Sequence, residues 1–295
     1  MAQDHDNASL LRLATRASVI TASILIVVKL GAWLVTGSVS VLASLVDSLL
    51  DAAASVITLY AVRYSLEPAD EEHRFGHGKA EYLAGLAQST FIGGSAILLM
   101  LMSIDRLMHP QPVEHIGVGV GVMIFSIAAT LVLLMIQRHV IRRTGSVAIR
   151  GDSLHYLTDF FTNVSIIVAL VLSAFGWPGF DPLFAMGIAL YILYSAWHIG
   201  YDAVQLLLDR ELPVDVQENI RRIANRHGSV RGIHELRTRQ SGRTWFIQLH
   251  LEMDGTLELR TAHRVADEVE VLIKEAYPEA DVIIHEDPFD PSSRN

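Results

Sequence analysis

The sequence predicts a membrane protein in which an all-α bundle of six spanning helices is followed by a small soluble α+β domain. Three observations support this fold class. The chain of 295 residues is 51% apolar, more than an ordinary soluble protein carries. Six apolar runs are long enough to cross a bilayer. Hydropathy then falls from Asp209 onward, where the pattern indicates an αββαβ order. We therefore predict a membrane domain at residues 1–208 and a soluble domain at residues 209–295.

The composition limits the chemistry that the chain can support. There is no cysteine, so disulfides, thiolate metal sites and iron–sulfur clusters are excluded, and a transition-metal site must use His, Asp, Glu or water. The formal net charge of −9 argues against a nucleic-acid partner. The first apolar run is longer than the core of a signal peptide and lacks a small-residue cleavage pattern, so we expect it to remain as a helix.

The spanning helices are predicted at residues 15–36, 38–63, 80–107, 115–141, 147–175 and 182–208. Turn-forming stretches separate several of them, namely Thr36-Gly37-Ser38, His109-Pro110-Gln111-Pro112, Gly176-Trp177-Pro178-Gly179 and Asp181-Pro182. Such short joints imply that consecutive helices run antiparallel. Most basic residues near the helix ends then share one side: Arg12, Arg16, Arg63, Arg74, Lys79, Arg138, Arg142, Arg143 and Arg150. The opposite side has Arg106, so the positive-inside rule predicts that both termini are cytoplasmic.

Two pairs of polar residues interrupt the apolar runs at a spacing of four. Asp47 and Asp51 belong to the second run, and His155 and Asp159 belong to the fifth. A helix places residues i and i+4 on one face, one turn apart. A charged side chain in hydrocarbon costs about 2.5 kcal/mol or more, so such residues normally face a bundle interior, a partner or a cation. A capped helix end, or bonds to neighbouring hydroxyls, is the alternative without a function.

The two pairs are also expected at similar depth. Counted at about 1.5 Å per residue from the cytoplasmic ends of their helices, they fall roughly 13 to 24 Å into the membrane. One imidazole with three carboxylates suits a divalent metal, with zinc the best fit. Leu154 precedes the histidine, where it could act as an apolar stopper. Lys29, near the middle of the first run, could snorkel, pair with an acid or line a path.

The polar loop at residues 67–79 carries three more potential ligands within eight residues, Asp70, His73 and His77. Gly76 and Gly78 would let the backbone fold around a cation. A solvated charged loop explains the same spacing equally well, and the sequence leaves both interpretations open.

The soluble domain is predicted to contain a helix, two strands, a helix and a strand, at Val214–His227, Gly232–Gln240, Arg243–Met253, Leu257–Tyr277 and Ala280–His285. Four histidines and two acids fall on its strands and second helix: His234, His250, His263, His285, Glu286 and Asp287. With a two-residue turn at Ser241-Gly242, His234 would face away from His250, because a slip of one residue reverses the side chains. Joint ligation from one hairpin therefore requires a three-residue loop, a bulge, or ligands from two chains.

These motifs resemble the cation diffusion facilitator family over nearly the whole chain, and most closely its bacterial zinc and ferrous-iron efflux members. The resemblance is carried by LVDSLLDAAAS (45–55), PADEEHRFGHGKAEYLAGL (68–86) and GDSLHYLTDFFTN (151–163). It implies a transport metal site at Asp47, Asp51, His155 and Asp159 and a loop metal site at Asp70, His73 and His77. It implies a cytoplasmic binuclear site from His234, His250, His263, His285 and Asp287. It also implies a charge interlock between Lys79 and Asp209, and a hydrophobic gate at Leu154.

The resemblance further implies a proton-coupled antiporter, not an enzyme, that exports zinc and also ferrous iron or cadmium from the cytoplasm. Such a protein would be a homodimer in the bilayer of the bacterial inner membrane, with both termini cytoplasmic and a metallochaperone-like soluble domain. Its partners would be divalent metal ions and protons. Zinc would serve as substrate and as a structural or regulatory ion, and no organic cofactor or nucleic acid would be needed.

The residues support coupling to protons without the resemblance. A metal needs neutral imidazole and ionised carboxylates, so binding releases the protons that an empty site held. No P-loop of the form G-x-x-x-x-G-K-[ST] is present, so an ion gradient is the expected energy source. A membrane metal sensor or receptor that does not transport remains the main alternative. An intramembrane aspartyl protease would need a Gly-x-Gly-Asp stretch, which the sequence lacks.

Overall fold

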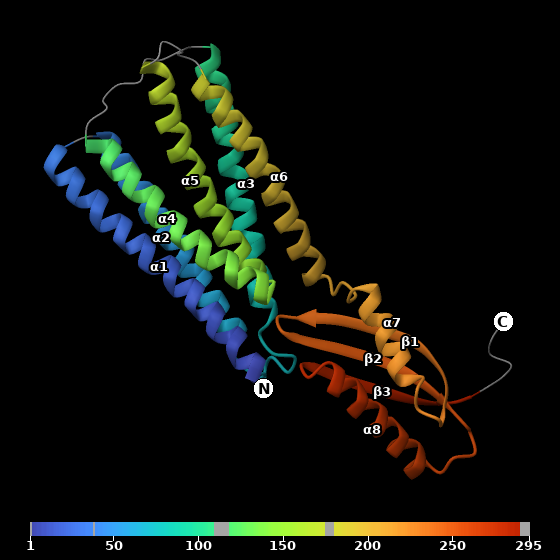
Figure 1. Ribbon diagram of the computed structural model, residues 1–295. Helices are drawn as coiled ribbons and strands as arrows, with labels where there is room; N and C mark the ends of the chain where they lie inside the picture. Colours follow the sequence, from blue (N-terminus) through green and yellow to red (C-terminus); the bar gives the residue numbers. More distant parts are fainter. Residues whose placement is uncertain (1, 38, 109–117, 175–179, 290–295) are drawn as a thin grey trace. The chain divides into compact units, whose positions relative to one another are not determined.

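The computed structural model describes residues 2–37, 39–108, 118–174 and 180–289 (Figure 1). The chain divides into two compact units. Among the described residues, the helical unit comprises those within 2–67 and 80–204, and the soluble unit comprises 68–79 and 205–289. The polar loop before the third helix therefore groups with the soluble part of the chain.

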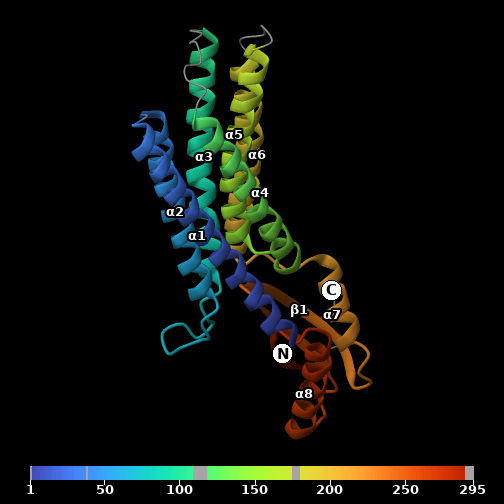
Figure 2. The same ribbon diagram turned by 60° about the vertical axis from the view of Figure 1, so that its left-hand side comes forward.

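The helical unit contains α1 (Ala2–Thr36), α2 (Val39–Ser65), α3 (Lys79–Met108), α4 (Val118–Thr144), α5 (Val147–Ala174) and α6 (Phe180–Leu207). These helices run alongside one another (Figures 1 and 2). Among the described residues, five of them are long and apolar enough to cross a membrane. The other helix, α5, has 28 residues but carries Arg150, Asp152 and Asp159 among its apolar side chains. The predicted class, a helical membrane part followed by an α+β domain, is confirmed.

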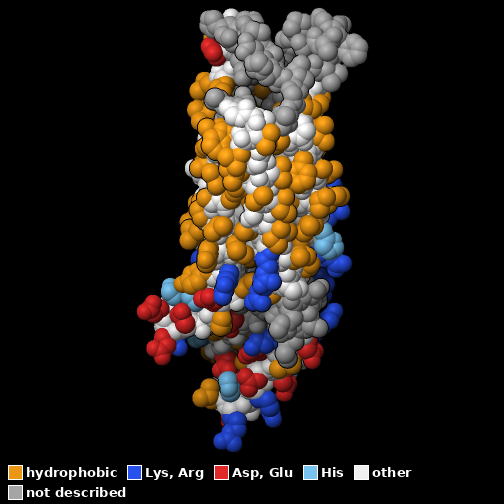
Figure 3. Space-filling view, turned by 90° about the vertical axis from the view of Figure 1, so that its left-hand side faces the viewer, with side chains coloured by type: hydrophobic (Ala, Val, Ile, Leu, Met, Phe, Trp, Pro, Cys, Tyr) orange, Lys and Arg blue, Asp and Glu red, His pale blue; other side chains and the backbone are white. Residues whose placement is uncertain are grey.

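On the face that Figure 3 shows, apolar side chains cover most of the helical unit, and basic side chains gather near one end of that apolar surface. Val27 on α1 is 68% exposed and Leu98 on α3 is 62% exposed. A continuous apolar surface of this kind suits hydrocarbon rather than water. The predicted joints at Ser38, His109–Pro112 and Gly176–Gly179 lie outside the described residues, as does the side chain of Arg106.

Small residues let α3 approach its neighbours closely. A Cβ atom on Gly85 would lie 2.6 Å from Val147 of α5, and one on Gly200 of α6 would lie 2.9 Å from the Ser89 hydroxyl. Close helix packing of this kind is typical of membrane bundles, where van der Waals contact drives association. At these positions a larger side chain would push the helices apart.

The soluble unit adds α7 (Val214–Ala224), β1 (Val230–Ser241), β2 (Thr244–Met253), α8 (Leu259–Ala276) and β3 (Ala280–Pro288). The strand order is β1-β2-β3, with β1 antiparallel and β3 parallel to β2, so α8 forms the crossover. Ile247, Leu249 and Leu251 of β2 are fully buried against a core that α7 and α8 complete. Because strand side chains alternate, the even-numbered residues of β2 point to the other face of the sheet. That face carries the candidate metal ligands of the sheet, His234, His250 and Asp287.

Candidate metal sites

Three residues predicted for the transport site meet inside the helical unit. Asp51 of α2 and His155 with Asp159 of α5 each offer a ligand atom, and these atoms lie within 4.8 Å of one another. The side chains of Asp51 and His155 are 7% and 13% exposed, and His155 Nε2 lies 2.7 Å from Asp51 Oδ1. The i, i+4 spacing puts His155 and Asp159 on one face of α5, and packing of α5 against α2 brings them to Asp51. This arrangement can hold a proton or a divalent cation.

Among the described residues, this group does not include Asp47, the fourth predicted ligand. It lies one helical turn before Asp51 and is exposed. Leu154 is buried, at 5% exposure. Lys29 is 7% exposed and donates hydrogen bonds from Nζ to the Ser44 carbonyl (3.1 Å) and the Ser48 hydroxyl (2.6 Å), so it binds neutral groups on α2.

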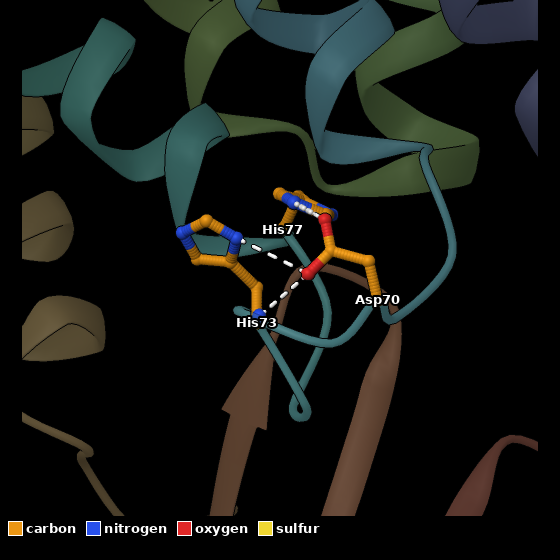
Figure 4. A group of neighbouring side chains, drawn as sticks. All are labelled: Asp70, His73 and His77. Carbon is orange, nitrogen blue, oxygen red and sulfur yellow. Dashed lines mark hydrogen bonds and ion pairs between the residues drawn. The ribbon is translucent and has the colours of Figure 1, made fainter.

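The loop site is also assembled within one chain (Figure 4). The Asp70 carboxylate contacts both rings, with Oδ1 3.4 Å from His73 Nδ1 and Oδ2 3.2 Å from His77 Nε2. The backbone N–H of His73 donates to Asp70 and lowers the pKa of that carboxyl below its ordinary value. Gly76 has a positive φ of 77°, which lets the chain reverse between the two histidines. The three ligand atoms lie within 4.8 Å of one another.

This loop is held against the β1–β2 hairpin within the soluble unit. A Cβ on Gly78 would lie 2.5 Å from the backbone of Ser241, so only glycine allows this approach. The Phe75 ring contacts Phe246 edge-on at 5.5 Å, and the Arg239 guanidinium lies 4.8 Å and 4.6 Å from the two ring centroids. The hairpin therefore supports the conformation that brings the loop ligands together.

Lys79 and Asp209 form the predicted ion pair, with Nζ 2.8 Å from Oδ1. Arg239 Nη1 also lies 3.5 Å from the same oxygen. Burial raises the pKa of Asp209, but the hydrogen bond and charge of Lys79, together with Arg239, outweigh burial and lower it. The pair fastens the end of the loop to the start of the segment that follows α6.

The register of the β1–β2 hairpin decides whether its histidines can act together. The two-residue turn is Gly242-Arg243, one position later than predicted, and Ser241 pairs with Thr244. Between the pairs His234–His250 and Arg237–Gln248, two residues of β1 face one of β2. This is a bulge, and its first residue, Glu235, has a φ of +46°. The bulge places His234 directly opposite His250. A bulge is one of the arrangements that the sequence analysis required for both histidines to bind the same metal.

The open face of the sheet, which α7 and α8 do not cover, carries most of the ligands predicted for the cytoplasmic site. His234, His250 and Asp287 offer atoms within 4.8 Å of one another, and the His250 Nδ1–H donates to Asp287 at 2.7 Å. That hydrogen bond lowers the pKa of Asp287 below its ordinary value. His285 pairs with His250 in register across β2 and β3, with ring centroids 4.6 Å apart. Because side chains alternate along a strand, residues 285 and 287 of β3 share this face.

His263 does not join this cluster within one chain. It lies on α8, which covers the opposite face of the sheet, and its ring is 3.4 Å from Glu286 and 3.8 Å from Asp267. Its ring therefore lies away from the cluster around Asp287, because Glu286 and Asp287 point to opposite faces of β3.

The sequence analysis did not identify Asp152 of α5 as a candidate functional residue. Asp152 is fully buried and accepts hydrogen bonds from side chains of α1, α2 and α4. It stands three residues before His155, so helical spacing puts both on one side of α5. That spacing was the available signal.

Both parts of the chain match known families. Residues 15–208 match the cation efflux transmembrane domain, and residues 212–289 match the cytoplasmic domain of cation efflux proteins. The cation-efflux pump FieF of Klebsiella pneumoniae subsp. pneumoniae is 54% identical over 285 residues, covering 96% of this chain and 95% of the relative. FieF of Salmonella choleraesuis is 54% identical over 280 residues, covering 94% and 93%. A solved structure of CzrB is 32% identical, covering 27% of this chain and 99% of that chain with a TM-score of 0.26.

The bundle of apolar helices, with carboxylates and an imidazole clustered in its interior, and the family matches together define a multi-pass membrane protein for metal cation efflux. The chain belongs to the cation efflux family, as the match of both domains and the 54% identity across nearly its whole length show.

Proposed function

We propose that the protein is a proton-coupled antiporter that exports divalent metal cations from the cytoplasm, with zinc as the main substrate and ferrous iron or cadmium as further ones. The observation that carries this proposal is the cluster of Asp51, His155 and Asp159 inside the helical unit. Two carboxylates and an imidazole provide the oxygen and nitrogen donors that zinc accepts in tetrahedral sites. Exposed Asp47, on the same helix as Asp51, is the fourth proposed ligand.

Exchange follows from the contact between His155 and Asp51. At 2.7 Å their facing atoms share one proton, because neither a bare imidazole nitrogen nor a bare carboxylate oxygen can donate to the other. A metal bound by the same two atoms must displace that proton. Export then requires that the site open in turn to each side of the membrane, as rocking helices allow in secondary transporters. Metal would leave as protons return, with Leu154 as the proposed gate.

The soluble unit supplies the proposed regulation. We assign residues 1–208 to transport and residues 209–295 to metal binding and dimerisation. Zinc at His234, His250, His285 and Asp287 would offset negative charge and favour association of two chains, with His263 contributed by the second one. The loop site at Asp70, His73 and His77 would act beside the ion pair of Lys79 and Asp209. We place the homodimer in the bacterial inner membrane, with both termini in the cytoplasm.

The alternative is a membrane metal sensor that binds without transport. Two observations favour a sensor. The loop and cytoplasmic clusters are both partly exposed, and a metal can reach them without a path through the membrane. The interior cluster has no role in such a sensor. Net metal movement against a concentration gradient would therefore separate the two functions.

The test uses the full-length protein in proteoliposomes with an imposed pH gradient. Zinc, ferrous iron, cadmium and manganese are supplied one at a time, and metal flux and proton flux are recorded together. We expect zinc to move against its gradient, opposite to protons, and to stop when the pH gradient is collapsed. Metal binding without any pH-driven flux would establish the sensor and refute the antiporter.

A further inference from the structure

Asp152 is a buried acid that has no role in the exchange of metal for protons proposed above. It lies in α5 with 0% exposure. No ion pair joins it to a basic side chain among the residues that the structure describes. An unpaired carboxylate taken fully out of water is costly unless hydrogen bonds or a proton compensate for the charge.

Hydrogen bonds reach it from α1, α2 and α4, and the Gln88 side chain of α3 also interacts with it. Oδ2 lies 2.5 Å from the Ser18 hydroxyl of α1 and 2.7 Å from Gln137 Nε2 of α4. Oδ1 lies 3.3 Å from the Ser55 hydroxyl of α2. None of these partners is a metal ligand, so the carboxyl forms a polar centre of its own beside the transport site.

This network satisfies both protonation states of Asp152 without moving a heavy atom. When the carboxyl is ionised, the hydroxyls of Ser18 and Ser55 and the Gln137 amide all donate to it. When it is protonated, the carboxyl O–H can donate to Ser18, whose own hydrogen turns to the Ala14 carbonyl at 3.1 Å. Ser55 likewise has a second partner in the Tyr156 hydroxyl at 2.9 Å. Adding or removing the proton therefore strands no buried donor.

The neighbouring titratable groups tie this centre to the metal cluster. His155 and Tyr156 follow Asp152 on α5, and Asp51 of α2 bonds to His155. On α3, Glu81 is buried and interacts with the first residues of α5. The basic side chains Arg16 of α1 and Arg138 of α4 are exposed, away from the buried centre.

We propose that Asp152 is a proton-binding residue separate from the metal ligands, which holds one proton in the metal-free protein and releases it when a dication occupies the transport site. This inference rests on the proposed antiport. A dication one helical turn away stabilises the ionised carboxylate by electrostatic attraction and has little effect on the neutral carboxyl. Its arrival therefore favours dissociation of the O–H bond, and the proton is released to water. Departure of the metal reverses the step.

Asp152→Asn tests the inference because it keeps the size and polarity of the side chain but cannot exchange a proton. Zinc is added to the purified full-length protein in weak buffer with a pH indicator, and bound zinc and released protons are counted. We expect Asp152→Asn to bind as much zinc per chain as the natural protein and to release about one proton fewer. Asp202→Asn is the matched control, since its carboxylate pairs with Arg150 at 2.8 Å, and it should leave the proton count unchanged.

An unchanged proton count at equal zinc binding would overturn the inference and leave Asp152 as a structural acceptor. If the natural protein itself binds and transports no zinc, the proposed function fails instead. Should Asp152→Asn not fold, Ser18→Ala serves in its place. Loss of that donor favours the protonated carboxyl, so the pH of half-maximal zinc binding should rise, and no shift would count against the proposal.

Discussion

His155 of α5 and Asp51 of α2 face each other at 2.7 Å in the interior of the helical unit. Both side chains are almost fully buried, and Asp159 lies beside them. The same two atoms can share a proton or bind a metal, so occupation by one excludes the other.

Replacing either residue should abolish transport. We expect His155→Ala and Asp51→Ala to lower zinc flux in proteoliposomes by at least about a hundredfold, since each removes a ligand rather than a supporting group. His198→Ala is the matched control, because this α6 histidine is exposed and bonds to the Tyr194 carbonyl of its own helix. Zinc flux retained in both His155→Ala and Asp51→Ala would end the assignment of the transport site.

Crowding the contact between loop and hairpin should weaken the loop site. Gly78→Ala would place a Cβ 2.5 Å from the Ser241 backbone and so displace His77. We expect a loss of roughly tenfold or more in zinc affinity at the loop site, measured calorimetrically in a protein whose other sites are removed by Asp51→Ala and Asp287→Ala. Gly228→Ala, which meets nothing within 4 Å, should change little. Equal affinity in both variants would show that the hairpin does not shape the site.

The bulge in β1 predicts that Glu235 tolerates glycine better than valine, which is the reverse of the order in a regular strand. Its φ of +46° suits glycine, so Glu235→Gly should preserve stability, while the branched side chain in Glu235→Val should cost about 1–2 kcal/mol. At Gln248, an exposed position in the regular part of β2, the order should reverse, because extended backbone favours valine over glycine. Thermal unfolding of the four variants measures both orders. The same order at the two positions would argue against the bulge.

The pKa of Asp287 predicts the pH dependence of zinc binding on the open sheet face. Because a hydrogen bond from His250 lowers that pKa, the carboxylate stays ionised between about pH 5 and 8 and is ready to bind a dication across this range. Asp287→Asn should therefore weaken zinc binding at every pH in this range without changing the slope of log affinity against pH. Competition with a chelating dye measures the affinity of both proteins, and a difference in slope between them would contradict the prediction.

The same carboxyl should affect stability in acid. A lowered folded-state pKa contributes stability that is present above the unfolded value and is lost as pH falls through the folded value. Asp287→Asn should therefore unfold at lower temperature than the natural protein at pH 7 and at nearly the same temperature near pH 2. A constant difference across this range would show that the loss is not electrostatic.

Much of the architecture follows from local periodicity. Apolar runs of spanning length indicated the helices, and alternation of apolar and polar residues indicated the αββαβ order, because both patterns depend on neighbours in sequence. The i, i+4 spacing put His155 and Asp159 on one face, and alternation placed His234, His250, His285 and Asp287 on the strands of the sheet.

Tertiary structure decided what depends on residues far apart in the chain. The sequence could not show that Asp47 lies exposed outside the interior cluster, that β3 runs parallel to β2, or that His263 turns to Glu286. The bulge at Glu235 and the hydrogen bonds of Asp152 were equally hidden. Periodicity fixes the face on which a side chain lies, but the register of one helix or strand against another is set by packing between separate elements. That register decides which of the faces meet, and so which residues can share a metal or a proton.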